Sequence, residues 1–239
     1  MGSSSITLEL LGIPIALNVL ISLIATVIVV SLLAWWMTRR LSVTDPPKSQ
    51  LAFEYLVDFV GNIVRDQLGA ATKSKYIGLS LALFLFILVA NLLGLPFLIE
   101  HDHISYFKSP TAELAGTLAL AVMMNIISHI FGMQAKGIGG YWKETYLVPT
   151  MPIKIVEELI NLLTLAMRLF GNIFAGEILL ALVASMGNSF GVATWVVGIP
   201  IQMVWQGFSI FIGAIQAYVF VTLSMVYLAE KVEIEEVEK

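Results

Sequence analysis

A single arginine, Arg168, lies inside an apolar stretch of sequence that is long enough to cross a lipid bilayer. A helix turns by about 100° per residue, so four polar side chains fall within roughly 40° of Arg168. They are Glu157, Asn161, Thr164 and Asn172. Glu177 points from the opposite face, because the intervening residues turn the helix through about 900°. Ionisable groups at membrane depth are costly and usually mark an ion path or a proton relay.

The two charged groups can do different chemistry. The guanidinium of Arg168 stays protonated at physiological pH, so it cannot relay a proton but can hold or repel an ion. The low dielectric of a membrane can keep the carboxyl group of Glu177 neutral, which would let it bind and release protons near neutral pH. Structural alternatives remain for both groups. Arg168 could join helices through an ion pair, and Glu177 could be hydrogen-bonded inside a helix bundle.

Further polar residues accompany this pair. Glu157 and Glu158 come near the start of the same predicted helix, where they could either cap the helix dipole or mark the mouth of a water-filled path. The last long apolar segment carries its own polar stripe, made of Gln202, Ser209, Gln216 and Tyr227. Such side chains bind water, which suits the wall of an aqueous half-channel. They can equally join membrane helices through hydrogen bonds worth about 1 kcal/mol.

The composition is that of an integral membrane protein. The 239 residues are 58% hydrophobic and 13% charged, with a mean hydropathy of +0.89, whereas a soluble domain is about 25% charged. Uncharged runs of about 20 residues predict spanning helices and therefore an all-α fold. The chain has no cysteine, so disulfides and thiolate metal sites are excluded. Its three histidines, His101, His103 and His129, are weak signals, and we expect no metal and no other cofactor.

The apolar runs predict a single membrane domain over residues 1–239, with five membrane-embedded helices. A sixth, amphipathic helix is predicted on the cytoplasmic membrane surface, because apolar residues recur there at helical spacing between charged ones. The alternative for this segment is a helix packed on a soluble partner. The predicted spans are 15–37, 77–99, 111–134, 153–184 and 198–229, and the surface helix is 49–67.

The last two spans are too long to stand upright. Each has about 32 residues, or roughly 48 Å of helix, against a hydrocarbon core of about 30 Å. We therefore expect a strongly tilted helical hairpin, with its turn on the outer side near Gly187, Asn188 and Gly191.

Basic residues predict the orientation. Six Lys or Arg residues lie between Arg39 and Tyr76, and one lies between Glu100 and Ser109. Since basic loops stay inside, the N-terminus should be outside and the C-terminus cytoplasmic. The glycines after Lys136 are not followed by the Gly-Lys-Ser/Thr ending of a phosphate-binding loop, so we expect no bound nucleotide. We also expect no nucleic acid among the partners.

The segment Arg168-Leu169-Phe170-Gly171-Asn172, followed by Ala175-Gly176-Glu177, resembles subunit a of the F-type ATP synthases. The resemblance covers nearly the whole chain. It also includes Pro110-Thr111-Ala112-Glu113, Lys136-Gly137-Ile138-Gly139-Gly140, and Gln216-Ala217-Tyr218-Val219-Phe220 with Tyr227.

This resemblance implies a proton-translocating stator subunit that makes no ATP itself. Arg168 would face the carboxylates of the rotating c ring and block proton leakage between two offset half-channels, with Asn172 and Gln216 beside it. Glu177 would relay protons on the outer side, and Glu157 or Glu158 would lie near the inner path. Glu113 would line a channel. Some relatives carry a histidine where this chain has Ser209, so a relay here would depend on water and Glu177.

The resemblance also implies partners and a location. The partners would be the c-ring subunits, the peripheral-stalk subunit b, the lipid bilayer and the rest of the complex. The location would be a bacterial plasma membrane. Two other classes of protein remain. A secondary transporter should show paired, interrupted spans in two related halves, which five unequal spans do not. A structural anchor would not require Arg168 and Glu177 on opposing faces. Selectivity between proton and sodium stays open.

Overall fold

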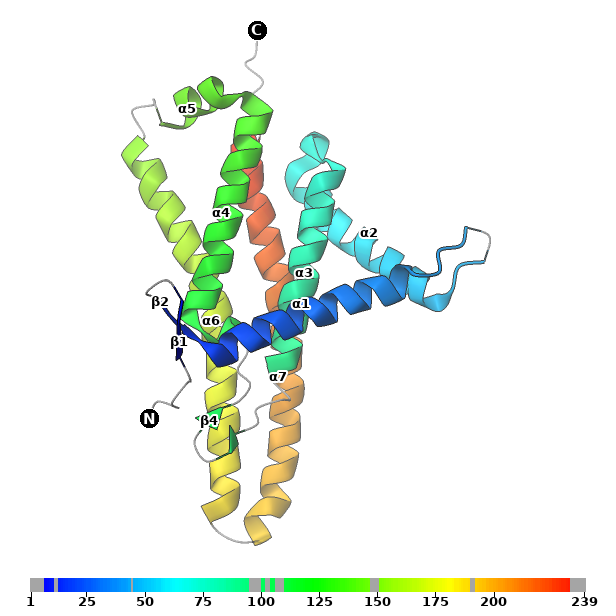
Figure 1. Cartoon of the computed structure of the whole chain (residues 1–239), viewed down its shortest axis with the longest axis vertical. Helices are drawn as coiled ribbons and strands as arrows, with labels where there is room; N and C mark the ends of the chain where they lie inside the picture. The colour runs from blue at the N-terminus through cyan, green and yellow to red at the C-terminus, as the bar shows by residue number, and fades with distance from the viewer. Residues whose placement is uncertain are drawn as a thin grey trace. The chain divides into compact units, whose positions relative to one another are not determined.

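The computed structural model describes residues 7–10, 13–43, 45–94, 100–101, 104–105, 110–146, 151–189 and 192–232. Within these ranges the architecture is helical, as predicted (Figure 1). Among the described residues, five helices are long and apolar enough to cross a membrane. The helices are α1 (Leu17–Thr38), α2 (Lys48–Leu68), α3 (Ser74–Gly94), α4 (Leu114–Lys136), α5 (Ile138–Tyr146), α6 (Met151–Ser189) and α7 (Val192–Val232), with short 3-10 turns η1 (Gly69–Ala71) and η2 (Pro110–Ala112).

Two short hairpins depart from the all-helical prediction. The strand β1 (Thr7–Leu10) pairs antiparallel with β2 (Ile13–Ala16), and β3 (Glu100–His101) pairs with β4 (Ile104–Ser105). The first predicted span therefore begins too early, since residues 15 and 16 belong to β2. The pairing gives the reason, because Ile15 and Ala16 lie opposite Leu8 and Thr7 of β1.

The other helix boundaries shift by a few residues. The third span begins at Leu114 rather than at residue 111, because Pro110–Ala112 form a 3-10 turn. Helix α3 begins at Ser74, before the predicted start at residue 77, and residues 95–99 of that predicted span lie outside the described residues. The short helix α5 is not predicted from the sequence, since its two glycines indicate a loop. It begins directly after Gly137, whose φ of +75° suits glycine.

The last two helices are longer than predicted. They have 39 and 41 residues rather than about 32. The predicted turn near Gly187, Asn188 and Gly191 lies close to the break between the helices, since α6 ends at Ser189 and α7 begins at Val192. Gly187 and Asn188 themselves are still helical in α6, and Gly191 lies outside the described residues. Glycine and asparagine each cost only up to about 1 kcal/mol inside a helix. That cost is smaller than the cost of leaving backbone groups without partners near lipid.

The amphipathic helix α2 is confirmed over Lys48–Leu68. Its buried side consists mainly of Val60, Ile63, Val64 and Leu68. The charged residues Glu54, Asp58, Arg65 and Asp66 are exposed. This division into an apolar and a charged face follows from the helical spacing of the sequence. Its place on a membrane surface stays a prediction.

The described helices belong to two compact units whose limits cut through helices rather than loops. The first unit comprises Met1–Trp36, Leu85–Thr117 and Arg168–Ala217, and the second comprises Met37–Phe84, Leu118–Met167 and Tyr218–Lys239. The core of the first includes Ile87, Ala90, Leu169 and Ile173. The core of the second includes Tyr76, Met124, Leu165, Phe220, Met225 and Leu228. The single domain predicted over residues 1–239 stays a prediction.

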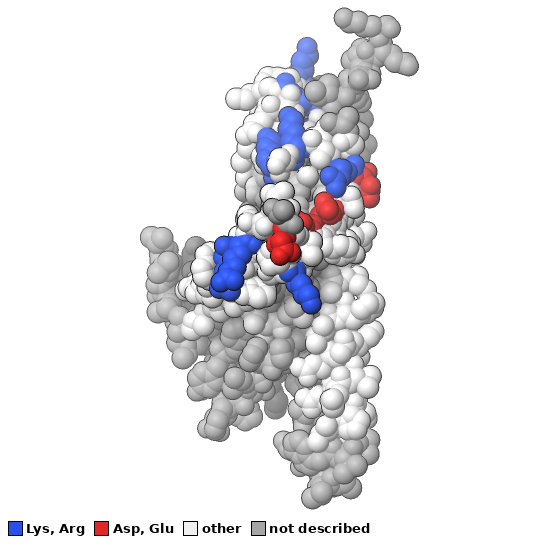
Figure 2. Space-filling view, turned by 90° about the vertical axis from the view of Figure 1, so that its right-hand side faces the viewer, with Lys and Arg blue, Asp and Glu red and all other residues white. Residues whose placement is uncertain are grey.

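Each long helix also exposes large apolar side chains. Examples are Val27, Leu92, Ile126, Leu159 and Val204, of which Val204 is 76% exposed. Figure 2 shows charged side chains gathered on part of one face, while another part of that face carries none. Extended apolar surface is unfavourable in water. It is the surface expected of helices that contact lipid.

Candidate functional site

Arg168 is exposed on α6, close to the fully buried Ala166 and Leu169. Helical geometry produces this contrast, because neighbouring positions point in directions about 100° apart. The predicted stripe residues Thr164 and Asn172 are exposed as well, and Asn161 is half-buried. The guanidinium therefore lies on a surface of the chain within an apolar helix, where it can meet a group from outside this chain.

Asn172 and Gln216 meet in the first unit. Asn172 Nδ2 on α6 donates a hydrogen bond of 2.8 Å to Gln216 Oε1 on α7. Gln216 is only 3% exposed, and its Nε2 has no hydrogen-bond partner among the described residues. Both residues were candidates from the sequence, and the structure brings them into contact. A buried amide with a free N–H can donate to another acceptor at this point.

A second buried contact joins α3 to α7, close in sequence to Gln216. Asn91 Nδ2 on α3 donates 3.0 Å to the carbonyl of Gly213, and Thr111 Oγ1 donates 2.8 Å to Asn91 Oδ1. Asn91 and Thr111 are fully buried. A Cβ atom at Gly213 would lie 3.1 Å from Asn91 Cβ, so glycine permits this close approach. Asn91 could have been found from the sequence, because it is a polar residue in the middle of an apolar run.

The remaining candidates of the first unit are less connected. Ser209 is 7% exposed, and Gln202 and Glu113 are half-buried. Among the described residues, no hydrogen bond joins any of these three side chains to another candidate. Glu177 belongs to α6, but its side chain lies outside the described residues. The predicted pairing of Glu177 with Ser209 therefore stays a prediction.

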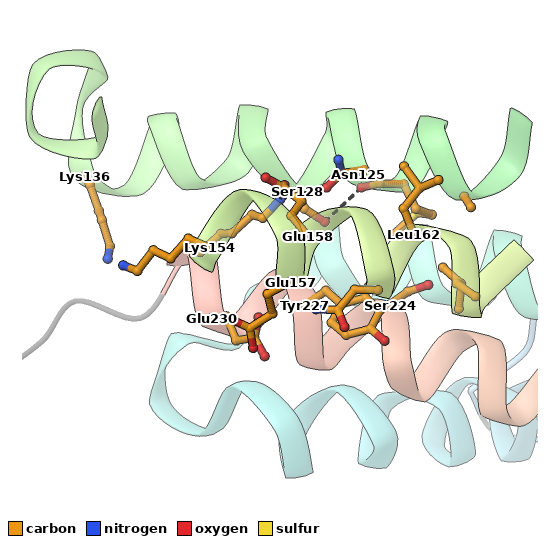
Figure 3. A pocket seen from close by; sticks show the side chains of 15 residues that line it. Asn125, Ser128, Lys136, Lys154, Glu157, Glu158, Leu162, Ser224, Tyr227 and Glu230 are labelled. Carbon is orange, nitrogen blue, oxygen red and sulfur yellow. Dashed lines mark hydrogen bonds and ion pairs between the residues drawn. The ribbon is translucent and has the colours of Figure 1, made fainter. Parts of the chain in front are cut away.

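The second unit contains a cavity of about 400 Å³ between α4, α6 and α7 (Figure 3). Four candidates from the sequence line it, namely Glu157, Glu158, Asn161 and Tyr227, whereas Thr164 does not. The sequence did not single out Ser224, Lys154, Glu230 or Lys231, which also line it. Carboxylates, ammonium groups and hydroxyls around one cavity make it polar enough to hold water.

Glu158 belongs to a compact charged network, here called the Glu158 cluster, with Lys231, His129, Asn125 and Tyr141. Lys231 Nζ donates to Glu158 Oε1 and, at 2.7 Å, to Asn125 Oδ1. His129 Nε2 lies 2.5 Å from Glu158 Oε1 and 3.0 Å from Lys231 Nζ. His129 Nδ1 lies 2.5 Å from the hydroxyl of Tyr141. The Glu158 cluster thus joins α4, α5, α6 and α7.

The Glu158 cluster changes two interpretations of the sequence. Capping of the helix dipole is excluded for Glu157 and Glu158, because α6 begins at Met151 and has no acidic residue in its first turn. His129, a weak signal in the sequence, contacts Glu158, with 2.5 Å between His129 Nε2 and Glu158 Oε1. The signal that could have found it is the spacing of Asn125, Ser128 and His129, which share one face of a helix.

Tyr141 secures α5 against the rest of the second unit. It is 2% exposed. A Cβ atom at Gly132 would lie 2.7 Å from Tyr141 Cε2 and 3.0 Å from the Lys231 carbonyl. Glycine at this position therefore leaves the space in which the tyrosine ring and the end of α7 pack. The ring of Tyr141 also packs edge-on against the ring of His129, with 5.9 Å between their centroids.

The sequence of the chain matches a known family. The sequence model for the family described as ATP synthase A chain matches residues 19–229. The chain belongs to this family. As a member of the ATP synthase A chain family with five membrane-length helices, it is a multi-pass membrane protein of a bacterial membrane and a membrane-sector, proton-translocating component of the complex.

Similar proteins cover nearly the whole length of the chain. ATP synthase subunit a of Bacillus pumilus is 45% identical over 245 residues, which include 98% of this chain and 100% of the relative. The subunit a of Bacillus subtilis is 45% identical over 95% of this chain and 96% of its own length. That of Enterococcus faecalis is 44% identical over 92% and 93%. Among the described residues, no group of three or more His, Asp or Glu could hold a metal ion.

Proposed function

We propose that this chain is the stator subunit that carries protons to and from a rotating c ring through two offset aqueous half-channels, with Arg168 between them. The observation that supports it is the exposed guanidinium of Arg168 on an apolar helix of an ATP synthase A chain family member. A charge that crosses the full membrane potential gains about 2.3 kcal/mol per 100 mV. The subunit would convert this energy into rotation by giving protons access to the ring from one side at a time.

Arg168 would act as a fixed charge. Its guanidinium attracts an ionised ring carboxylate and keeps that carboxylate in place until the next one arrives. Because arginine holds its proton at physiological pH, no proton can pass through it from one half-channel to the other. Asn172 and Gln216 would support this position through their hydrogen bond, and the free Nε2 of Gln216 can donate to a carboxylate or to water.

The half-channels would use the other candidate residues. On the outer side, Glu177 would exchange protons, with Ser209, Gln202 and Glu113 holding water beside it. On the inner side, the cavity lined by Asn161 and Tyr227 would admit water, and one of Glu157 and Glu158 would exchange protons there. Thr164, which does not line the cavity itself, would lie on the path between the cavity and Arg168. The c ring, subunit b and the lipid bilayer would be the partners. The N-terminus would lie outside and the C-terminus in the cytoplasm.

The test uses the complete ATP synthase complex in membrane vesicles. Replacement of Arg168 with Ala should reduce ATP synthesis driven by an imposed proton gradient to background, while the complex still assembles. Met167→Ala serves as the control, since Met167 is also exposed, at 51%, but uncharged. It should retain synthesis close to that of the unaltered complex. Full synthesis by the Arg168→Ala complex would exclude the proposed function.

A further inference from the structure

Two adjacent glutamates on α6 have different surroundings. Glu158 is held by Lys231 of α7 and by His129 of α4, so its negative charge is matched by groups in contact with it. Its side chain is 24% exposed, and that of Lys231 is 13% exposed. When one partner of an ion pair that is mostly shielded from water is removed, the protein loses much stability, because the other charge stays buried without a partner. These contacts make Glu158 a structural anion.

Glu157 makes no such contacts. It is exposed, lines the cavity, and has no hydrogen bond or ion pair to any residue that the structure describes. Figure 3 shows Glu157 directed toward Glu230 of α7, whereas Glu158 is directed toward α4. Its carboxyl group therefore lies near the like-charged Glu230 and is open to water in the cavity.

The wall of the cavity supplies an independent indication of bound water. Ser224 on α7 is only 1% exposed, and its hydroxyl has no hydrogen-bond partner among the described residues. It lines the same cavity as Tyr227. A buried hydroxyl nearly always has a partner, and ordered water is the usual one when no protein group is in reach. The cavity of about 400 Å³ has room for several waters, which occupy about 30 Å³ each in the liquid.

We propose that Glu157, and not Glu158, is the carboxylate that exchanges protons in this cavity, through water held by Ser224 and Tyr227. The inference rests on the proposed function, because it assigns the residue of the inner path. In the transfer, a proton passes from water to the Glu157 carboxylate and leaves from there to the next water. No other bond changes. Glu158 remains ionised within its cluster throughout.

The proposal is tested with variants of the complete complex in inverted membrane vesicles. Glu157→Gln should slow ATP-driven proton pumping at least about tenfold, as expected when an acid–base group is removed. The amount of assembled complex and its thermal midpoint should stay unchanged. Ser224→Ala should slow pumping in the same direction by a smaller factor, because it removes a single water ligand.

Glu158→Gln should behave differently. It leaves Lys231 without its carboxylate, so the amount of assembled complex should fall at least about twofold. A double variant that carries Glu158→Gln and Lys231→Met removes both charges. It should recover assembly and pump at a rate close to that of the unaltered complex. Glu157→Asp, which keeps the carboxyl group, should recover most of the flux lost in Glu157→Gln.

Two results would overturn the inference. One is pumping at the full rate by the Glu157→Gln complex. The other is a properly assembled double variant that pumps as slowly as Glu157→Gln. Arg168→Ala, measured in the same vesicles, separates the two proposals. If Arg168→Ala abolishes synthesis while Glu157→Gln pumps normally, only the assignment of Glu157 fails. If Arg168→Ala leaves synthesis intact, the proposed function fails.

Discussion

Asn172 on α6 donates a hydrogen bond of 2.8 Å to the side-chain oxygen of Gln216 on α7. The two residues are 44 positions apart in the chain, and the acceptor is almost completely buried. The contact joins the two longest helices of the described chain within a few residues of Arg168 in sequence. A polar contact of this kind fixes the position of one apolar helix along the other.

The first prediction concerns this contact. Asn172→Ala and Gln216→Ala should each lower the free energy of unfolding by about 0.5–1.5 kcal/mol. The double variant should lose less than the sum, since both changes remove the same hydrogen bond. Unfolding of the detergent-solubilised complex measures the three values. Strictly additive losses would show that the hydrogen bond contributes nothing to stability.

The close approach of Gly213 to Asn91 leads to a second prediction. Gly213→Ala should destabilise the chain by about 1–2 kcal/mol. The new Cβ atom would lie 3.1 Å from Asn91 Cβ, so Asn91 would have to shift. Gly207→Ala is the matched control on the same helix, since nothing lies within 4 Å of its added Cβ. It should be neutral or gain up to about 1 kcal/mol of helix propensity. Equal thermal midpoints for the two variants would contradict the prediction.

Gly132 provides a third prediction. Gly132→Ala should lower the free energy of unfolding by about 1–3 kcal/mol, because its Cβ would overlap the Tyr141 ring and the end of α7. It should also loosen α5, so that cleavage by trypsin at the exposed Lys143 becomes faster. Gly78→Ala is the control, with open space around the added Cβ. Unchanged cleavage at Lys143 would show that Tyr141 does not hold α5.

The fourth prediction tests the outer half-channel. Glu177→Gln should slow both passive and ATP-driven proton flux, because the amide cannot gain and lose a proton. Glu177→Asp should retain part of the flux, since its carboxyl group remains. Fluorescence quenching of a pH-sensitive dye in vesicles measures the rates, with the amount of assembled complex measured in parallel. Normal flux in assembled Glu177→Gln complexes would make Glu177 a structural residue.

The apolar runs of the sequence were sufficient to predict the helices that cross a membrane. The reason is general: within lipid, every backbone N–H and C=O group must be bonded inside its own helix. The length and composition of a run therefore specify the element without knowledge of its neighbours. The same local argument failed at the ends of the runs. There the two short hairpins, the 3-10 turn at Pro110–Ala112 and the additional turns of α6 and α7 were not predicted.

Helical periodicity was also sufficient to select Arg168 and its neighbouring polar residues, since position along one helix determines direction about its axis. Periodicity did not reveal which residues on different helices meet. Lys231 contacts His129 across 102 residues of sequence, and Asn91 contacts Gly213 across 122. Such pairs depend on how the helices pack, and a pattern along one segment holds no information about that.

Glu157 and Glu158 show most directly what the sequence determines and what depends on tertiary packing. In the sequence they are neighbours of the same type, and no local rule separates them. In the folded chain, one residue step turns the side chain by about 100°. That rotation brings Glu158 into contact with a lysine and a histidine from two other helices, while Glu157 lines the same cavity without such contacts. The sequence alone determined that carboxylates occur here, and tertiary packing decided which of them is paired and which is open to water.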